Sequence, residues 1–332
     1  MLYIGIDISK NFYVAAVVVK GKSRVQKFPN TFGGHERLIK WAENRERKAK
    51  SGELVFVMEA TSRYHLDCAL FLHSRGLRVC VVNPRYVRDF RRAMGYENKT
   101  DITDAEVLAR FGEVRCPVEW QPPSEEIARL RDLVRRREDL VRMIQQERNR
   151  LSVPNLSSHL RESLERVLEF LTGELADVER QIREVVSGDE ELSRQVELLE
   201  SVPGVGFWTA VVVLALVGDI KLFRNKRALV SYFGVNPQNF ESGSSVRWSR
   251  LSRGGPSEAR KYLYLSAMAG VKSGGIFREY KERLVSRGKS AKIALCAVMR
   301  KLAGIIYAIL HSGRPFSEKI YRQISAQFQI SS

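Results

Sequence analysis

Four acidic residues have the types and placement that suit metal-dependent chemistry on phosphates. Asp7 follows an apolar run at residues 2–6, and Glu59 closes a second apolar run at residues 54–58. Asp101 and Asp104 stand three positions apart, so on a helix they would share one face. Four carboxylates brought together repel one another strongly, and a reason to gather them is to bind hard divalent cations. These acids therefore predict a magnesium site and phosphoryl chemistry.

Each acid also has an ordinary structural interpretation when it is considered alone. Asp7 would then cap a turn, Glu59 would pair with Arg63, and Asp101 or Asp104 would be a helix N-cap. The combination of all four with this strand context favours the metal site.

The expected elements can bring the acids together. Strands are predicted at residues 2–8, 12–19, 24–28, 53–58 and 77–82, and helices near residues 34–50, 65–75, 85–94 and 103–113. Three meandering strands followed by alternating helices and strands match the ribonuclease-H-like arrangement. There the first and fourth strands lie side by side and parallel. Asp7 and Glu59 then become neighbours, although 52 positions separate them, and the helix beginning near Asp101 crosses them.

Charge is distributed unevenly along the 332 residues, whose net charge is +17. Residues 1–114 carry 20 Lys and Arg against 13 Asp and Glu (+7), residues 115–200 carry 14 against 19 (−5), and residues 201–332 carry 21 against 6 (+15). A single strongly basic end indicates a polyanionic partner, and nucleic acid fits best. The chain is long enough for two or three domains.

The middle of the chain has helical periodicity. A spacing of four and three runs from Leu164 to Val185, and a second stripe runs from Ile127 to Ile144 with the charged residues 135–137 on its exposed side. Residues 152–155 separate the two stripes. Two long antiparallel helices are predicted, which either project as a hairpin or pair with another subunit.

The basic end contains two candidate contact regions. Pro203-Gly204-Val205-Gly206 resembles the turn of a helix-hairpin-helix unit, in which backbone N–H groups approach a phosphate; a tight turn without a ligand is the alternative. A loop at residues 234–262 carries Ser242 before Gly243, and the serine is a candidate nucleophile that needs activation. Alternatively it belongs to an ordinary flexible loop. The nucleic-acid-binding candidates are Arg247, Arg250, Arg253, Arg260 and Lys261, with Lys99 as a phosphate contact or a simple surface lysine.

The remaining predictions concern the rest of the basic end and the cysteines. Buried helices with basic rims are expected at residues 259–272 and 293–310, followed by a loosely held tail after about residue 316. The four cysteines and five histidines lack metal-ligand spacing. No signal peptide or membrane span is predicted, so the location is expected to be cytoplasmic, with association to the bacterial nucleoid when the protein acts.

The ordered set of motifs resembles the transposases of the insertion sequence 110 family over nearly the whole length. The N-terminal motifs are residues 4–10, 58–61 and 99–104; the C-terminal motifs are residues 202–206, 233–237, 242–243 and 251–255. The resemblance implies a RuvC-like domain at 1–118, a coiled-coil or helical hairpin at 119–198 and a mainly helical transposase domain at 199–332. The fold class is then α/β plus α.

The resemblance also implies a mechanism and partners. Asp7, Glu59, Asp101 and Asp104 would hold Mg²⁺, and Ser242 would attack DNA to form a 5′-phosphoserine link, although Ser244 and Ser245 stand close by. A structured guide RNA of the element would pair with donor and target DNA. Dimers or tetramers would share active sites between subunits. The competing hypotheses are a hydrolytic RuvC-like Holliday-junction nuclease and a non-enzymatic nucleic-acid-binding protein.

Overall fold

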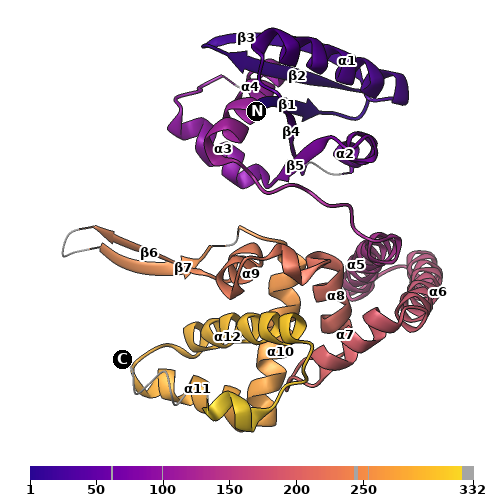
Figure 1. Ribbon diagram of the computed structural model, residues 1–332. Coiled ribbons are helices and arrows are strands. Elements are labelled where there is room, and N and C mark those ends of the chain that lie inside the picture. Colours follow the sequence, from indigo (N-terminus) through magenta and orange to yellow (C-terminus); the bar gives the residue numbers. More distant parts are fainter. Residues whose placement is uncertain (61–62, 99, 243–245, 253, 324–332) are drawn as a thin grey trace. The chain divides into compact units, whose positions relative to one another are not determined.

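A computed structural model describes residues 1–60, 63–98, 100–242, 246–252 and 254–323, with side chains left out at 239–249. The chain divides into two compact units, Met1–Pro122 and Pro123–Ser332 (Figure 1). Each unit has its own hydrophobic core. The expected three-part division stays a prediction.

The first unit is built on a five-stranded sheet with the order β3-β2-β1-β4-β5. β1 pairs antiparallel with β2 and parallel with β4, and β4 pairs parallel with β5. The strands are β1 (Leu2–Ile8), β2 (Phe12–Val19), β3 (Lys22–Pro29), β4 (Leu54–Glu59) and β5 (Arg78–Val82). The first and fourth strands are therefore parallel neighbours, as the ribonuclease-H-like arrangement requires.

Helices cover both faces of this sheet. α1 (Phe32–Ala49) and α2 (Tyr64–Ser74) pack with the even-numbered side chains of β1 and β4, including Ile4 and Phe56. α3 (Pro84–Ala93) and α4 (Asp101–Arg115) pack on the opposite face against Val55 and Val57. Because strand side chains alternate between the faces, residues 5, 7, 57 and 59 lie on the α4 face. The predicted elements of this unit are confirmed to within two or three residues.

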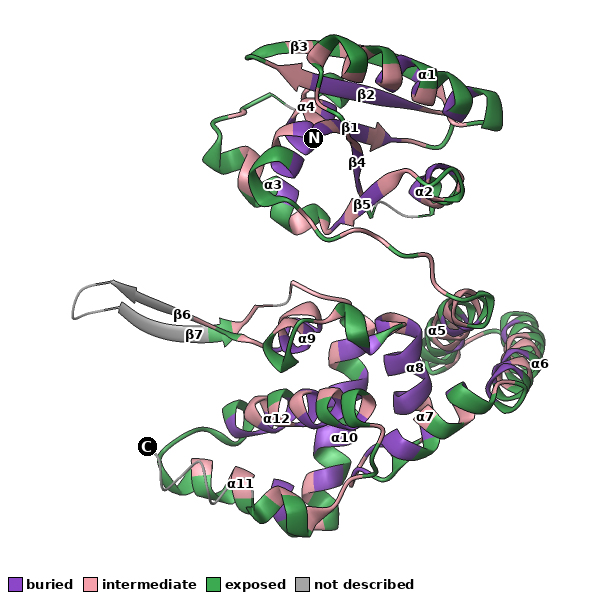
Figure 2. Cartoon of the chain, in the orientation of Figure 1, coloured by how far each residue is buried: buried purple, intermediate pink, exposed green. Residues whose placement is uncertain are grey.

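The second unit is mainly helical and surrounds α8, which is buried along most of its length (Figure 2). Its elements are α5 (Glu125–Leu151), α6 (Ser158–Ser187), α7 (Glu190–Glu200), α8 (Phe207–Val217), the 3₁₀ turn η1 (Ile220–Leu222), α9 (Lys226–Tyr232), β6 (Pro237–Ser242), β7 (Val246–Leu251), α10 (Ser257–Ser273), α11 (Gly275–Ser286) and α12 (Ala291–Ser312). One core cluster runs through the helices from α5 to α12.

α5 and α6 form the predicted antiparallel hairpin, but much of it packs within the second unit. Leu130, Val178 and Ile182 are buried in the core shared with α8. The prediction that residues 135–137 lie on an exposed side is wrong for Arg137, whose side chain is 12% exposed. α8 and α10 approach that side and place Trp208 and Tyr262 against the guanidinium. The carboxylates beside it are Glu138 of α5 itself and Glu179 of α6. The coiled coil itself stays a prediction.

The turn between α7 and α8 contains Gly204 at φ +87°, a value that favours glycine. A side chain at Gly204 would overlap the backbone of Ser266 and Gly270 in α10. Close packing against α10 thus accounts for this glycine in the structure. The helix-hairpin-helix contact with phosphate stays a prediction.

α12 is long and apolar enough to cross a membrane by length and composition, and half of its most apolar window is buried in the unit. Leu302, Ile306 and Ile309 belong to the core, so α12 serves here as a core helix.

Two features of the second unit differ from the sequence predictions. α11 is not predicted. The glycine and serine residues at 234–262 predict a loop, whereas β6 and β7 form a two-stranded sheet there.

Candidate active site

Asp7 and Glu59 lie on neighbouring strands near the same edge of the sheet. The parallel register pairs Ile6 with Met58, so the next residues along the two strands are Asp7 and Glu59. Both side chains are on the α4 face, and both residues are half-buried. This placement agrees with the sequence prediction for these two acids.

α4 reaches this part of the sheet because small residues let it approach β1. Gly5 is buried, and a Cβ there would overlap the Ala105 carbonyl oxygen and the Ala109 amide nitrogen, and lie 2.9 Å from the Leu108 carbonyl carbon. Ala105 packs with Val14, the residue paired with Asp7 across β1 and β2. The first turn of α4 is thereby fixed next to the strand that carries Asp7.

Gly5→Ala is expected to destabilise the first unit by about 3 kcal/mol, because the new methyl group meets helix backbone that cannot move alone. Gly33→Ala in α1 is the matched control, since a Cβ there meets nothing within 4 Å. Its effect should be neutral or slightly stabilising. Urea denaturation compares the two variants, and similar midpoints would show that the close approach of α4 contributes little.

Asp101 and Asp104 lie in the first turn of α4, as predicted, but neither is the N-cap. Thr100 fills that position: its hydroxyl accepts a hydrogen bond from the Thr103 amide at 3.2 Å, and the Thr103 hydroxyl accepts one from the Thr100 amide at 3.0 Å. The alternative in which either aspartate caps the helix is therefore wrong. Asp101 is exposed and Asp104 is half-buried.

Asp104 is held by a residue that the sequence interpretation overlooked. The Arg91 guanidinium of α3 forms an ion pair with Asp104 and donates hydrogen bonds to the Asn98 carbonyl at 2.7 Å and the Thr103 hydroxyl at 3.0 Å. Arg91 therefore connects α3, the segment before α4 and the first turn of α4. An arginine ten and thirteen positions before the two acids gives no recognisable sequence signal.

The four carboxylates have the chemistry that a divalent cation requires, but their side chains are not gathered around one point. Carboxylate oxygens are the ligands that Mg²⁺ prefers, and β1, β4 and α4 direct the acids to one end of the sheet. Yet within the described part of the chain, no three His, Cys, Asp or Glu side chains group closely enough to hold a metal ion. Arg91 supplies a positive charge beside Asp104 instead.

Ser242 lies in the second unit, at the end of β6 where its backbone pairs with Val246 of β7. Ser242 is therefore the last residue of a strand rather than part of an irregular loop. Gly243, Ser244 and Ser245 fall outside the described residues. The alternation of Val246 and Trp248 with the polar residues Arg247 and Ser249, next to a Ser-Gly sequence, is the signal that could have identified this hairpin.

The predicted nucleic-acid-binding residues have different environments. Arg260 donates hydrogen bonds to the carbonyl oxygens of Gly255 and Pro256 at 2.5 and 3.2 Å. The Lys261 ammonium lies 2.8 Å from a Glu138 carboxylate oxygen. Arg250 is exposed near the end of β7, and Arg247 pairs through its backbone with Glu241. Lys99 and Arg253 lie outside the described residues.

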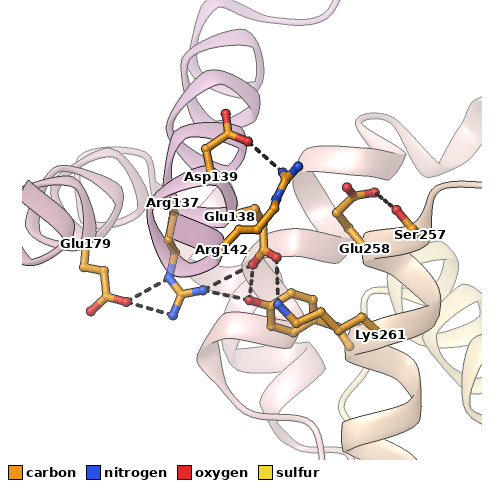
Figure 3. Close-up of polar contacts among 9 residues, drawn as sticks. Arg137, Glu138, Asp139, Arg142, Glu179, Ser257, Glu258 and Lys261 are labelled. Carbon is orange, nitrogen blue, oxygen red and sulfur yellow. Dashed lines mark hydrogen bonds and ion pairs between the residues drawn. The ribbon is translucent and has the colours of Figure 1, made fainter. Parts of the chain in front are cut away.

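Lys261 belongs to a polar network that joins α5 to α10 (Figure 3). Glu138, 11% exposed, accepts hydrogen bonds from Lys261 at 2.8 Å and from the Tyr262 hydroxyl at 2.6 Å. Arg137 donates to Tyr262 at 2.7 Å and to Glu179 of α6 at 2.8 Å, and its guanidinium stacks 4.0 Å from the Trp208 ring. The network holds the hairpin of α5 and α6 onto the helix that follows the serine hairpin.

The network sets the ionisation of Glu138. Burial opposes the charge, but the hydrogen bonds from Lys261 and Tyr262 and the charges of Lys261 and Arg137 outweigh it, so the pKa of Glu138 lies below its ordinary value. A depressed folded-state pKa stabilises the protein above the unfolded pKa of about 4.3, and this stabilisation is lost as pH falls through the folded value.

Glu138→Gln is expected to lower the free energy of unfolding at pH 7 by about 2 kcal/mol, the loss of a partly buried charged hydrogen bond. The difference from wild type should shrink once the pH falls below about 4.3. Glu165→Gln, an exposed acid on α6, is the control and should change stability by less than about 0.5 kcal/mol. Urea denaturation across pH measures both, and a difference that does not change with pH would contradict the assigned ionisation.

Comparison with known families gives two matches along the chain. Residues 4–161 match the DEDD-type transposase family of IS110. Residues 196–282 match the transposase family of IS116, IS110 and IS902. The first match contains all four predicted acids, and the second contains Ser242.

Relatives span almost the full chain. The pilin gene-inverting protein of Moraxella bovis is 30% identical, over 96% of this chain and 98% of its own. The transposase for insertion sequence element IS1111A of Coxiella burnetii is 25% identical, over 71% and 72%. Among solved structures, T. thermophilus RuvC in complex with a Holliday junction substrate aligns with 36% of this chain and 98% of its own, with 13% identity and a TM-score of 0.25.

Proposed function

Because the chain belongs to the transposase family of IS110, IS116 and IS902 and is therefore an enzyme acting on DNA, we propose that it cuts and rejoins DNA through a serine–phosphate intermediate. Asp7, Glu59, Asp101 and Asp104 hold a divalent cation, Mg²⁺, and Ser242 attacks the scissile phosphodiester. The observation that carries the proposal is the register of β1 and β4, which sets Asp7 beside Glu59 on the face covered by α4.

The proposed reaction balances as a transesterification. The Ser242 oxygen bonds to the phosphorus while the bond from phosphorus to the 3′ oxygen of the neighbouring nucleotide breaks. The serine proton is lost to solvent or a base, and the departing 3′ oxygen gains one. A bound cation would neutralise phosphate charge and favour the oxygen nucleophile. Because the phosphodiester energy is kept in the covalent link, strands can be rejoined without ATP.

Partners follow from the same proposal. Donor and target DNA are the substrates, an RNA of the element guides their choice by base pairing, and a homo-oligomer, dimer or tetramer, supplies acids and serine. The acids and Ser242 stand in different compact units of the chain. That separation is compatible with sites completed between subunits in the cytoplasm.

The test is a denaturing gel of the full chain incubated with element-end DNA, guide RNA and Mg²⁺. A protein-linked DNA band that protease digestion converts to a faster species supports the proposal. Free cut ends without a linked species would assign the chain to hydrolytic junction nucleases. Tight binding without cutting would leave it a nucleic-acid-binding protein.

A further inference from the structure

The second unit contains a groove that neither the acids nor Ser242 explain. Its volume is about 1100 Å³. Walls come from α9, α11, α12, the base of the β6–β7 hairpin and residues 314–321. The last segment was expected to be a loosely held tail, but in the structure the Phe316 amide donates to the Ser201 hydroxyl at 2.8 Å and Arg322 pairs with Glu279 at 2.6 Å.

The groove is strongly cationic. Among the described residues that line it there is no Asp or Glu. The seven Lys and Arg residues that line it are Lys226, Arg227, Arg250, Lys292, Arg300, Lys301 and Arg314. The nearby acids Glu279 and Glu318 are both engaged by Arg322. Positive charge thus gathers along the rim, which suits several phosphates rather than one carboxylate ligand.

The floor of the groove is apolar and aromatic. Ile293, Ala297 and Ile305 come from one face of α12, and Ile293 is 53% exposed. The Lys301 ammonium lies 4.1 Å from the centre of the Tyr280 ring and 4.9 Å from that of Tyr321. A floor of this kind can cover the flat faces of unpaired bases.

The size of the groove and the chemistry of its surface together indicate which class of ligand it binds. The groove is as large as the largest of the roughly 300–1,000 Å³ typical of small-molecule sites, and its seven cations favour a stretch of polyanion over a single small ligand. An intact duplex would present its phosphates to the rim but leave the apolar floor uncovered. A single strand offers both phosphates and unstacked bases, the combination found in single-strand grooves.

We propose that this groove binds an unpaired DNA strand during recombination. The proposal rests on the proposed function, because strand exchange requires a DNA strand to leave its duplex partner. The cations on the rim neutralise successive phosphates, and the α12 floor with Tyr280 and Tyr321 covers the bases. The interaction is independent of sequence.

The test uses fluorescence anisotropy of the full chain with labelled oligo(dT) of about 12 nucleotides, within the roughly 4–16 nucleotides of known single-strand sites. Lys292→Glu/Arg300→Glu is the groove variant; both side chains are exposed. Its affinity for oligo(dT) should fall about a hundredfold at low salt, and wild-type affinity should fall steeply as salt rises. Lys272→Glu/Arg287→Glu makes the same change in net charge outside the groove and should lower affinity less than about threefold.

Parallel titrations with a duplex and with oligo(rU) identify the ligand. The proposal is supported if wild type binds oligo(dT) more tightly than it binds the duplex and oligo(rU), and if only the groove variant loses this binding. The proposal would be overturned if both variants lost affinity for oligo(dT) equally, or if the groove variant kept its affinity. Tighter binding of the duplex or of oligo(rU) than of oligo(dT) would also overturn it. The measurement needs neither metal nor Ser242, so its outcome is separate from that of the cleavage test.

Discussion

Ser242→Ala is expected to abolish the protein-linked DNA species, because no other group in the proposed reaction can form the phosphoester bond. Alanine keeps the backbone free to pair with Val246 in the β6–β7 hairpin, so DNA binding should stay within about twofold of wild type. The loss should be complete on a denaturing gel, whereas DNA binding is followed separately by anisotropy.

Three controls make this result specific. Ser244→Ala and Ser245→Ala change neighbouring hydroxyls, and Ser252→Ala changes one just beyond β7. Each should keep the linked species. If Ser244→Ala or Ser245→Ala removes the band while Ser242→Ala retains it, the nucleophile is a neighbour. If Ser242→Ala yields free cut ends at the wild-type rate, the chemistry is hydrolytic.

Asp7→Asn is expected to slow strand cleavage about a thousandfold, equivalent to about 4 kcal/mol of transition-state stabilisation and within what a metal site supplies. Asparagine has the shape of aspartate without its charge, so packing against β2 and α4 should survive. Single-turnover cleavage rates measure the effect. Thermal unfolding with and without Mn²⁺ gives a second readout, since the shift that the ion causes in wild type should disappear.

Asp89→Asn is the matched control, because Asp89 is an exposed acid of the same unit that pairs with Arg85. Asp89→Asn should keep the wild-type cleavage rate and the shift in unfolding temperature that Mn²⁺ causes. Normal cleavage by Asp7→Asn would remove that carboxylate from the active site. A global loss of stability with equal loss of DNA binding would assign Asp7 a structural role instead.

Much of the first unit was predictable because its signals are local. Strands of buried β-branched residues end at acids, and the parallel pairing of β1 with β4 follows from the order of the elements. The Arg91–Asp104 ion pair was not predictable, since it depends on how the segment after α3 turns back toward α4. Gly5 was part of a recognised motif, but its role required knowing which helix crosses β1.

The second unit was less predictable because its interactions join distant segments. Arg137 belongs to a charged run in the sequence, yet Tyr262 and Trp208, from two other helices, surround it. The pairing of β6 with β7 was missed because the segment that contains them is rich in serine and glycine, which predict a loop. The groove brings together positions as far apart as Lys226 and Tyr321, and no local pattern marks them as neighbours.

The pairing of β1 with β4 also has a consequence for synthesis on the ribosome. β1 emerges first, but its parallel partner follows only after some fifty further residues and α4 later still. Contacts so distant along the chain form slowly, since loop closure precedes them. A nascent chain that lacks α4 cannot bring Asp101 and Asp104 to Asp7 and Glu59, so the proposed cation site cannot assemble before α4 has been translated.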